Sequence, residues 1–130
     1  MDLSEYQGGD FEAAILRGVK MLDLKEDWDD EGAIPIKKNI FDKAVNFLCL
    51  HIPSYLSDKV NLLPGRNSEV MLHIKSEFFE VLIDFGASDL AHFYADNYST
   101  LSVKGTIRLN EECANLMMEL FTVLSNAAYN

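Results

Sequence analysis

The stretch EVMLHIKSEFFEVLIDFGASDLAHFYAD, residues 69–96, decides the fold. Apolar and polar side chains alternate along it, which is the pattern of strands with one buried face. The alternation predicts strands over 69–75, 78–85 and 91–96. The predicted inner face is formed by Val70, Leu72, Ile74, Phe79, Val81, Ile83, Phe85, Ala91, Phe93 and Ala95.

The connections between these segments are short, with a turn signal at 86–89. Short connections favour antiparallel neighbours, because a parallel pair needs a crossover of about a dozen residues or more. Residues 60–63 predict a further short strand before a turn at 64–67. Residues 101–109 are interrupted by Lys104-Gly105 and predict either one strand or a hairpin. We therefore expect three to five strands.

Apolar residues recur at helical spacing in three other segments. The predicted helices cover about 11–24 and 40–52, with N-caps at Asp10 and Asn39, and Asn110 is the predicted N-cap of a last helix. Gly18 costs about 1 kcal/mol relative to alanine inside a helix, which indicates the close approach of another backbone. The helix faces are Phe11, Ile15, Val19 and Leu22, then Phe41, Val45, Leu48 and Ile52, then Met117, Leu120, Phe121, Leu124 and Ala128.

This order of elements predicts an α+β fold. Its antiparallel sheet of three to five strands packs against two N-terminal helices and one C-terminal helix, in the order α-α-β-β-β-(β)-α. A chain of 130 residues fits one domain over 1–130. Residues 1–9 end in Gln7-Gly8-Gly9 and are expected to form a flexible arm.

The net charge of -10 limits the partners of the chain. It repels phosphate backbones, which disfavours direct binding of nucleic acid, and it attracts basic surfaces. The alternative reading is that acidity keeps the protein soluble. No apolar run approaches the about 20 residues that span a bilayer. With no secretory signal, Cys49 and Cys113 are interpreted as reduced, packed thiols of a cytoplasmic protein.

Residues 23–31 hold six carboxylates around Trp28, the single tryptophan. A calcium loop beginning at Asp27 would need a bidentate glutamate at its twelfth position, where Lys38 stands, and its ninth is Pro35. We therefore predict neither a metal site nor a cofactor. The acidic run is interpreted either as a solvated surface or as a surface that meets a partner.

Motifs of catalysis are not found in the sequence. It has no phosphate-binding glycine loop, no nucleophile elbow and no local signature around either cysteine. Glu80 and Asp84 lie about 13 Å apart along a strand, too far to share a proton. His73 and His92 share the outer sheet face, where a third ligand would have to be Asp84 or Glu80. Strand alternation makes such neighbours common, so the two histidines are interpreted as ordinary surface residues.

Apolar side chains interrupt the polar outer face of the predicted sheet. They are Met71, Phe78, Leu82 and Tyr94, among His73, Lys75, Glu80, Asp84, His92 and Asp96. An uncovered face would be an apolar patch rimmed by charge, as protein-binding surfaces often are. Alternatively, the last helix covers part of this face and the apolar residues belong to the core.

The segment DWDDEGAIPI, residues 27–36, resembles an uncharacterised group of small bacterial and phage proteins. The group carries Asn/Asp-Trp-Asp/Asn-Gly-x-Gly-Ala-x-Pro-Ile between two helices, followed by a helix, a turn and an alternating strand. Here these match 40–52, 64–67 and 69–74. The chain departs from the group at Asp30, often Gly, and at His73-Ile74, often Glu-Trp. The resemblance implies a shared fold and the company of mobile elements, and it supplies no activity.

These observations predict a non-enzymatic protein that occupies a basic surface of a protein partner, such as an inhibitor, an antitoxin, an immunity protein or a phage anti-defence factor. A small enzyme or ligand-binding domain and a homodimeric scaffold are the alternatives. Trp28, Gly32 and Pro35 are expected to anchor the acidic segment, with the indole packed between two helices. Gly32 is expected to permit a sharp reversal of the chain before Pro35 starts the next helix. The predicted partner-binding residues are Glu26, Asp27, Asp29, Asp30, Glu31, Met71, Leu82 and Tyr94.

Overall fold

The computed structural model describes residues 3–110 and 112–129, with side chains described as far as residue 126. Among these residues, five antiparallel strands form one sheet in the order β1-β2-β3-β4-β5. Each strand pairs with its neighbour along the chain, as the short connections predict, and residues 101–109 give one strand. The strands are β1 Val60–Pro64, β2 Val70–Lys75, β3 Glu80–Phe85, β4 Leu90–Asp96 and β5 Ser102–Arg108.

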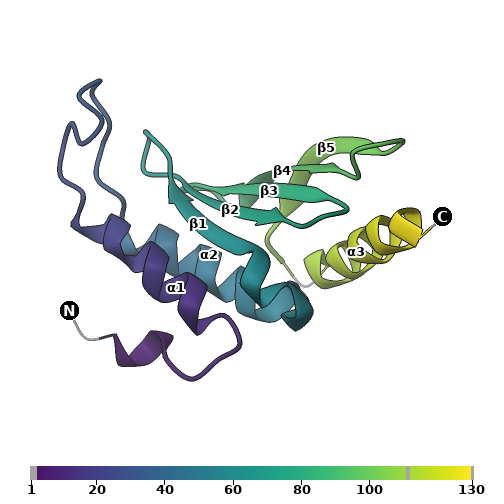
Figure 1. Cartoon of the computed structure of the whole chain (residues 1–130). Helices are drawn as coiled ribbons and strands as arrows, with labels where there is room; N and C mark the ends of the chain where they lie inside the picture. The colour runs from purple at the N-terminus through teal and green to yellow at the C-terminus, as the bar shows by residue number, and fades with distance from the viewer. Residues whose placement is uncertain (1–2, 111, 130) are drawn as a thin grey trace.

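Two described α-helices precede the sheet and one follows it, which confirms the predicted α+β class and element order. They are α1 Glu12–Gly18, α2 Lys38–His51 and α3 Cys113–Tyr129, with short 3-10 helices η1 Ser4–Tyr6, η2 Val19–Asp23 and η3 Ser54–Lys59. Figure 1 shows the α-helices on one side of the sheet, with α3 set apart from α1 and α2. No helix in the described part of the chain is long and apolar enough to cross a membrane.

The sheet face beneath the helices carries the core. Of the predicted inner-face residues, all are buried except Phe93, which is partly buried. The ring of Phe93 lies across the strand partner Gly105, where an added Cβ would sit 3.0 Å from Cε1 of Phe93. Gly105, part of the interruption seen in the sequence, therefore leaves room beside β5 for the ring of Phe93 from β4.

The predicted close approach at Gly18 is confirmed. A Cβ there would lie 2.9 Å from Cβ of Leu62, so α1 packs directly against β1. The predicted helix over 11–24 is α-helical to Gly18 and continues as the 3-10 helix η2 to Asp23. The helix type changes directly after Gly18, where the helix meets Leu62.

The predicted N-caps Asp10 and Asn39 are wrong. The positions before α1 and α2 are Phe11 and Lys37, and neither makes a side-chain cap bond. Before α2 a tertiary contact takes the place of a local cap, because the buried hydroxyl of Ser68 accepts the N–H of Lys37 at 3.0 Å. The cap was misjudged because its acceptor comes from the β1–β2 turn.

The third predicted N-cap finds support at α3. The side-chain oxygen of Asn110 accepts the N–H of Glu112 at 2.9 Å, just before the helix begins. Along α3, Met117, Phe121 and Leu124 are buried as predicted and Leu120 is partly buried. The predicted position Ala128 lies outside the described side chains.

The arm expected over residues 1–9 is in fact anchored at Tyr6. This side chain is 5% exposed, its hydroxyl donates to Asp42 at 2.6 Å, and its ring meets Phe41 edge-on. Burial and the Asp42 carboxylate raise the pKa of Tyr6 to about 12. Residues 1–2 lie outside the described part of the chain. The N-terminal segment therefore covers the side of α2 that faces away from the sheet.

The outer sheet face is left uncovered by the described helices, which settles the alternative left open by the sequence. Met71, Leu82 and Tyr94 lie together on this face and are half-buried. Phe78, expected on the same face, instead lies in the tight turn before β3 and is 41% exposed. The patch is therefore smaller than predicted.

Candidate functional site

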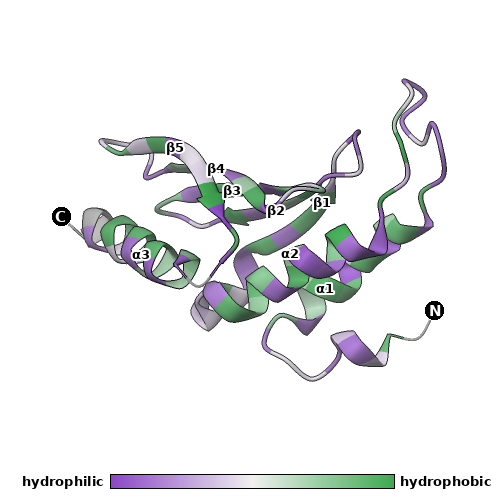
Figure 2. Cartoon of the chain, turned by 180° about the vertical axis from the view of Figure 1, so that it is seen from behind, coloured by the Kyte–Doolittle hydropathy of each residue, from purple (hydrophilic) through white to green (hydrophobic). Residues whose placement is uncertain are grey.

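The segment between η2 and α2, residues 24–37, is called the acidic loop here. Figures 1 and 2 show it rising beyond the level of the sheet, on the side away from the helices, next to the β1–β2 turn. Its chain folds back on itself, with the N–H of Asp27 donating to the carbonyl of Ala33 at 2.7 Å. The loop is therefore an ordered projection from the body of the protein.

Three residues of the acidic loop adopt left-handed backbone conformations. Asp27 has φ 63°, Asp30 has φ 61° and Gly32 has φ 88°. Glycine takes this conformation without steric cost, and aspartate tolerates it better than most residues. The sharp reversal predicted at Gly32 is confirmed. Pro35 precedes α2 by three residues, in an extended link, and does not start the helix.

Two predicted partner-binding carboxylates instead hold the loop together. Asp27 accepts the N–H of Gly32 at 2.6 Å, and Asp29 accepts the N–H groups of Glu31 at 2.9 Å and Ala33 at 3.0 Å. These bonds satisfy backbone donors that an irregular loop would otherwise leave to water. Asp27 and Asp29 are therefore structural residues of the loop.

Arg66 in the β1–β2 turn ties the loop to the sheet. Its Nε donates to Asp29 at 2.7 Å, and its guanidinium also donates to the carbonyl of Glu31. Partial desolvation acts to raise the pKa of Asp29, but the N–H groups of Glu31 and Ala33 and the Arg66 charge together hold that pKa below its ordinary value. Asp29 is therefore ionised at neutral pH and already paired.

A backbone bridge makes the attachment firmer. The N–H of Ile34 donates to the carbonyl of Arg66 at 2.8 Å, and Ile34 pairs with Asn67 as an isolated parallel bridge. The next apolar residue, Ile36, enters the core. The acidic loop is thus fixed at its end by both polar and apolar contacts.

The expected burial of Trp28 between two helices is wrong. Its side chain is only partly buried, and its indole N–H donates to the carbonyl of Ile34 at 2.9 Å. Trp28 therefore braces the two arms of the acidic loop against each other. The sequence indicated that an aromatic ring in an acidic run needs a partner, but not that the partner lies in the loop itself.

The remaining carboxylates of the loop face solvent. Glu26, Asp30 and Glu31 are exposed, on a backbone that the bonds described above hold in place. They adjoin the outer sheet face, because Met71 stands opposite Leu63 beside the β1–β2 turn that carries Arg66. The two predicted surfaces are therefore neighbours at this end of the sheet.

A metal site finds no support in this geometry. The carboxylate oxygens of Asp27 and Asp29 that a cation would need already accept hydrogen bonds from backbone N–H groups. The positive end of each N–H group therefore points toward the place where a cation would bind. His73 and His92 are separated by the whole of β3, and His73 instead lies 3.5 Å from Glu80. Within 3–110 and 112–129, no three His, Cys, Asp or Glu side chains are grouped to hold a metal ion.

The outer sheet face contains a shallow hollow of about 400 Å³. Met71, Leu82 and Tyr94 line it together with Asp84 and His92. Burial, and then the nearby charge of Glu69, raise the pKa of Asp84 above its ordinary value. The hollow combines apolar surface with the polar side chains of Asp84, His92 and Lys104.

One chemically interesting pair was missed by the sequence reading. Sγ of Cys113 at the start of α3 lies 3.2 Å from Nε2 of His51 at the end of α2. The His51 ring meets Phe47 edge-on, with centroids 4.8 Å apart, which fixes its orientation. Burial lowers the pKa of His51, so its ring is neutral at pH 7 and its unprotonated nitrogen can accept a hydrogen bond from the thiol.

Nothing local in the sequence announces this pair, because its members are 62 positions apart. The nearer cysteine, Cys49, is two residues before His51, and this spacing puts the two on different faces of α2. Both Cys113 and His51 line a cavity of about 500 Å³ between α2 and the start of α3. Only the packing of α3 beside α2 brings the thiol and the imidazole together.

Comparison with protein-family models, curated proteins and solved structures finds no match to the chain. The resemblance of residues 27–36 to a group of bacterial and phage proteins therefore stays a prediction. Arguments about function rest on the site itself.

Proposed function

We propose that the protein is a non-enzymatic binding protein whose acidic loop occupies a basic surface of a protein partner. One observation carries the proposal: Asp27, Asp29 and Arg66 hold the loop in shape, and Glu26 and Asp30 are left exposed on it. A loop that is already ordered loses less conformational entropy on binding than a flexible one.

The charge of the whole chain supports the same partner. At -10, the protein is attracted to basic surfaces and repelled by free nucleic acid. A basic groove on a nucleic-acid-binding protein or nuclease has the complementary field. Inhibitors, antitoxins, immunity proteins and phage anti-defence factors act in this way, and the mobile-element company implied by the resemblance is consistent with them.

The adjoining outer sheet face extends the proposed contact. Met71, Leu82 and Tyr94 are half-buried and supply apolar area beside the charged loop. In this arrangement the loop accelerates encounter and the apolar patch slows dissociation, because charge mainly sets the on-rate of association.

The test begins with a partner captured from the native host and purified. Its association rate is then measured with wild-type protein and with a variant carrying Glu26→Gln, Asp30→Asn and Glu31→Gln, which spares the two structural aspartates. For the wild type we expect the on-rate to fall at least ~10-fold between low and physiological ionic strength, because salt screens the attraction.

A matched control removes the same three charges elsewhere, by Asp10→Asn, Asp58→Asn and Glu77→Gln at exposed sites. The proposal requires the loop variant to associate more slowly than the control at equal salt, with both melting near the wild type. Equal on-rates for the two variants would show that only net charge matters and would sink the loop as the docking site.

A specific observation favours a second candidate, thiol chemistry at Cys113. His51 is positioned to take the Cys113 proton, and the resulting thiolate is the nucleophilic form of cysteine. With iodoacetamide as a probe, the C–S bond forms, the C–I bond breaks, iodide leaves and the proton goes to His51. The other free thiol, Cys49, is exposed and provides an internal reference.

The experiment measures alkylation of both cysteines by mass spectrometry at pH 7. Although the residue is exposed overall, partial desolvation of its sulfur raises the pKa of Cys49, so this thiol should react slowly. The enzyme candidate requires Cys113 to react faster than Cys49 and to lose that advantage in His51→Gln but not in the cavity control Asn46→Ala. A Cys113 that is slower than Cys49, or indifferent to His51→Gln, is a packing residue.

A further inference from the structure

The most exposed large apolar side chains of the described residues line a single groove. Leu50 is 75% exposed, Met118 is 70% exposed and Tyr55 is 62% exposed. The groove has a volume of about 550 Å³ and runs between α3 on one side and the end of α2 with η3 on the other. It is called the α3 groove below.

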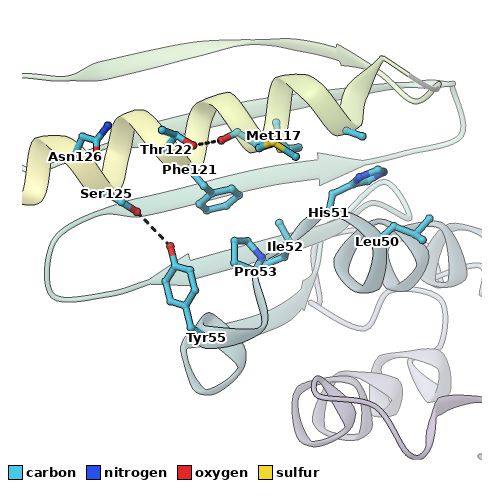
Figure 3. A pocket seen from close by; sticks show the side chains of 12 residues that line it. Leu50, His51, Ile52, Pro53, Tyr55, Met117, Phe121, Thr122, Ser125 and Asn126 are labelled. Atoms are coloured by element: carbon cyan, nitrogen blue, oxygen red, sulfur yellow. Dashed lines mark hydrogen bonds between the residues drawn. The ribbon is translucent and has the colours of Figure 1, made fainter.

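The walls of the α3 groove are linked and its floor is apolar. Tyr55 of η3 and Ser125 of α3 approach across it, with their hydroxyls 3.2 Å apart (Figure 3). The rings of Phe121 and Pro53 and the Ile52 side chain lie between these walls. The groove is therefore an apolar surface left open to solvent.

The α3 groove also lacks formal charge. None of the described residues that line it is Asp, Glu, Lys or Arg, and its one histidine, His51, has a lowered pKa. Over its whole length α3 carries one charged residue, Glu119. A helix so poor in charge is typical of buried positions, and the centres of protein interfaces are likewise depleted in charge and rich in Met and aromatic residues.

We propose that the α3 groove binds a second copy of this chain. Two copies that each carry a net charge of -10 repel one another, so a contact between them is favoured where carboxylates are absent. The groove supplies such a surface. It also meets the geometric demand of a two-fold interface, in which the same patch serves both partners and must complement itself.

The surface can complement itself because exposed side chains stand next to the groove that would receive them. Met118 and Leu50 stand at the rim of the α3 groove, and in a two-fold dimer each enters the groove of the other copy. Methionine suits this role because its unbranched chain adapts to irregular surfaces. The proposed contact thus places the most exposed apolar atoms of one copy against the apolar floor of the other.

The size of this surface sets the expected affinity. The residues of α3 that line the groove run from Ala114 to Asn126, which is about 20 Å along the helix. A contact of this length is small for a protein interface, since a standard one buries about 800 Å² per partner. We therefore expect a reversible dimer with a Kd on the order of 10 µM.

This inference is independent of the acidic loop. Figure 1 shows α3 and the acidic loop at opposite ends of the molecule, so a dimer through α3 leaves both loops open. A dimer of this kind presents two acidic loops and gains from a partner that also carries two basic surfaces. Failure of either proposal leaves the other intact.

The test is sedimentation equilibrium of the full chain from about 1 µM to about 200 µM, a range that brackets the expected Kd. A reductant is present so that the exposed Cys49 forms no disulfide between copies. We expect a monomer–dimer equilibrium that persists or strengthens in high salt, because the contact is uncharged and salt screens the repulsion between copies.

Three single substitutions locate the contact. Met118→Glu and Leu50→Glu should each weaken dimerisation at least ~10-fold, because a carboxylate would be buried without a partner. Leu63→Glu is the matched control, at a 41% exposed leucine on the outer sheet face. All three positions are exposed, so the melting temperatures should stay near the wild type and report that each variant is folded.

The outcomes separate cleanly. A dimer weakened by Met118→Glu and Leu50→Glu but not by Leu63→Glu supports the proposal. A chain that stays monomeric at about 200 µM overturns it, since the surface is then too weak for self-association. A dimer weakened only by Leu63→Glu also overturns it and places self-association on the outer sheet face.

Discussion

The helices α2 and α3 lie on the same side of the sheet, yet one is enclosed and the other is not. The α2 helix has the sheet on one side, where Phe47 meets Phe85, and the N-terminal segment on the other, where Phe41 meets Tyr6. The α3 helix meets the sheet through Phe79 and Phe121, and its flanks expose Met118 and other apolar residues.

The difference shows that an apolar side chain belongs to the core or to the surface according to whether another segment packs over it. In α2, apolar residues on both sides find neighbours and become core, except in its last turn, where Leu50 is exposed. In α3, residues of the same kind outside the buried stripe have no described neighbour to cover them, so they become surface. A contiguous apolar surface that is exposed to solvent often marks a site of contact with another molecule.

The largest expected effect tests this contrast in packing. Phe41→Ala removes a side chain with no exposed area and should lower the free energy of unfolding by about 3–5 kcal/mol. Phe121→Ala should cost less, about 2–3 kcal/mol, because α3 borders a groove and can settle into the space. Urea unfolding at equal protein concentration measures both. Equal losses would mean that α3 is as enclosed as α2.

A smaller effect is expected in the acidic loop. Trp28→Ala should lower the free energy of unfolding by about 1–2 kcal/mol, since it removes one hydrogen bond and a partly buried ring. Trp28→Phe, which keeps a ring but lacks the N–H donor, should fall between wild type and Trp28→Ala. A loss of about 3–5 kcal/mol in the urea titration would instead make Trp28 a core residue.

The features that the sequence predicted correctly are those that depend on residues close together in the chain. Strict alternation in 69–96 predicted the inner face, because strand alternation is local and the sheet buries one side only. Glycine destabilises a helix, so its presence at Gly18 predicted that another segment packs too closely there for a side chain. The contact with Leu62 confirms this prediction. The order of elements followed from the same local patterns.

The errors arose where a residue has its partner far along the chain. Ser68 replaces a local cap before α2, Arg66 binds Asp29, and Asp42 holds Tyr6. Of the candidate site, the exposed acidic residues were foreseeable from composition. The structural role of Asp29 was not foreseeable, because a carboxylate that folds a loop and one that meets a partner have the same sequence signature.

Tyr6 offers a pH test of the cover over α2. The folded protein favours the neutral phenol, since its pKa is raised to about 12 from an ordinary 10.0. Its contribution is fully present below pH 10 and is lost as the pH rises from 10 to 12. Tyr6→Phe should therefore cost about 1 kcal/mol at pH 7, and the gap from wild type should close toward pH 12. A gap that stays constant across that range would show that the Tyr6–Asp42 bond does not stabilise the fold.

The smallest effect is expected on the open flank of α3. Val123 is 46% exposed, so Val123→Ser should change the free energy of unfolding by less than about 0.5 kcal/mol. Its neighbour Leu124 has no exposed area, and Leu124→Ala should cost about 2–5 kcal/mol. Both are measured at about 1 µM, below the expected Kd of self-association, so that only folding is reported. A loss at Val123 that approaches the loss at Leu124 would mean that this flank is covered within a single chain, and α3 would then resemble α2 in being enclosed on more than one side.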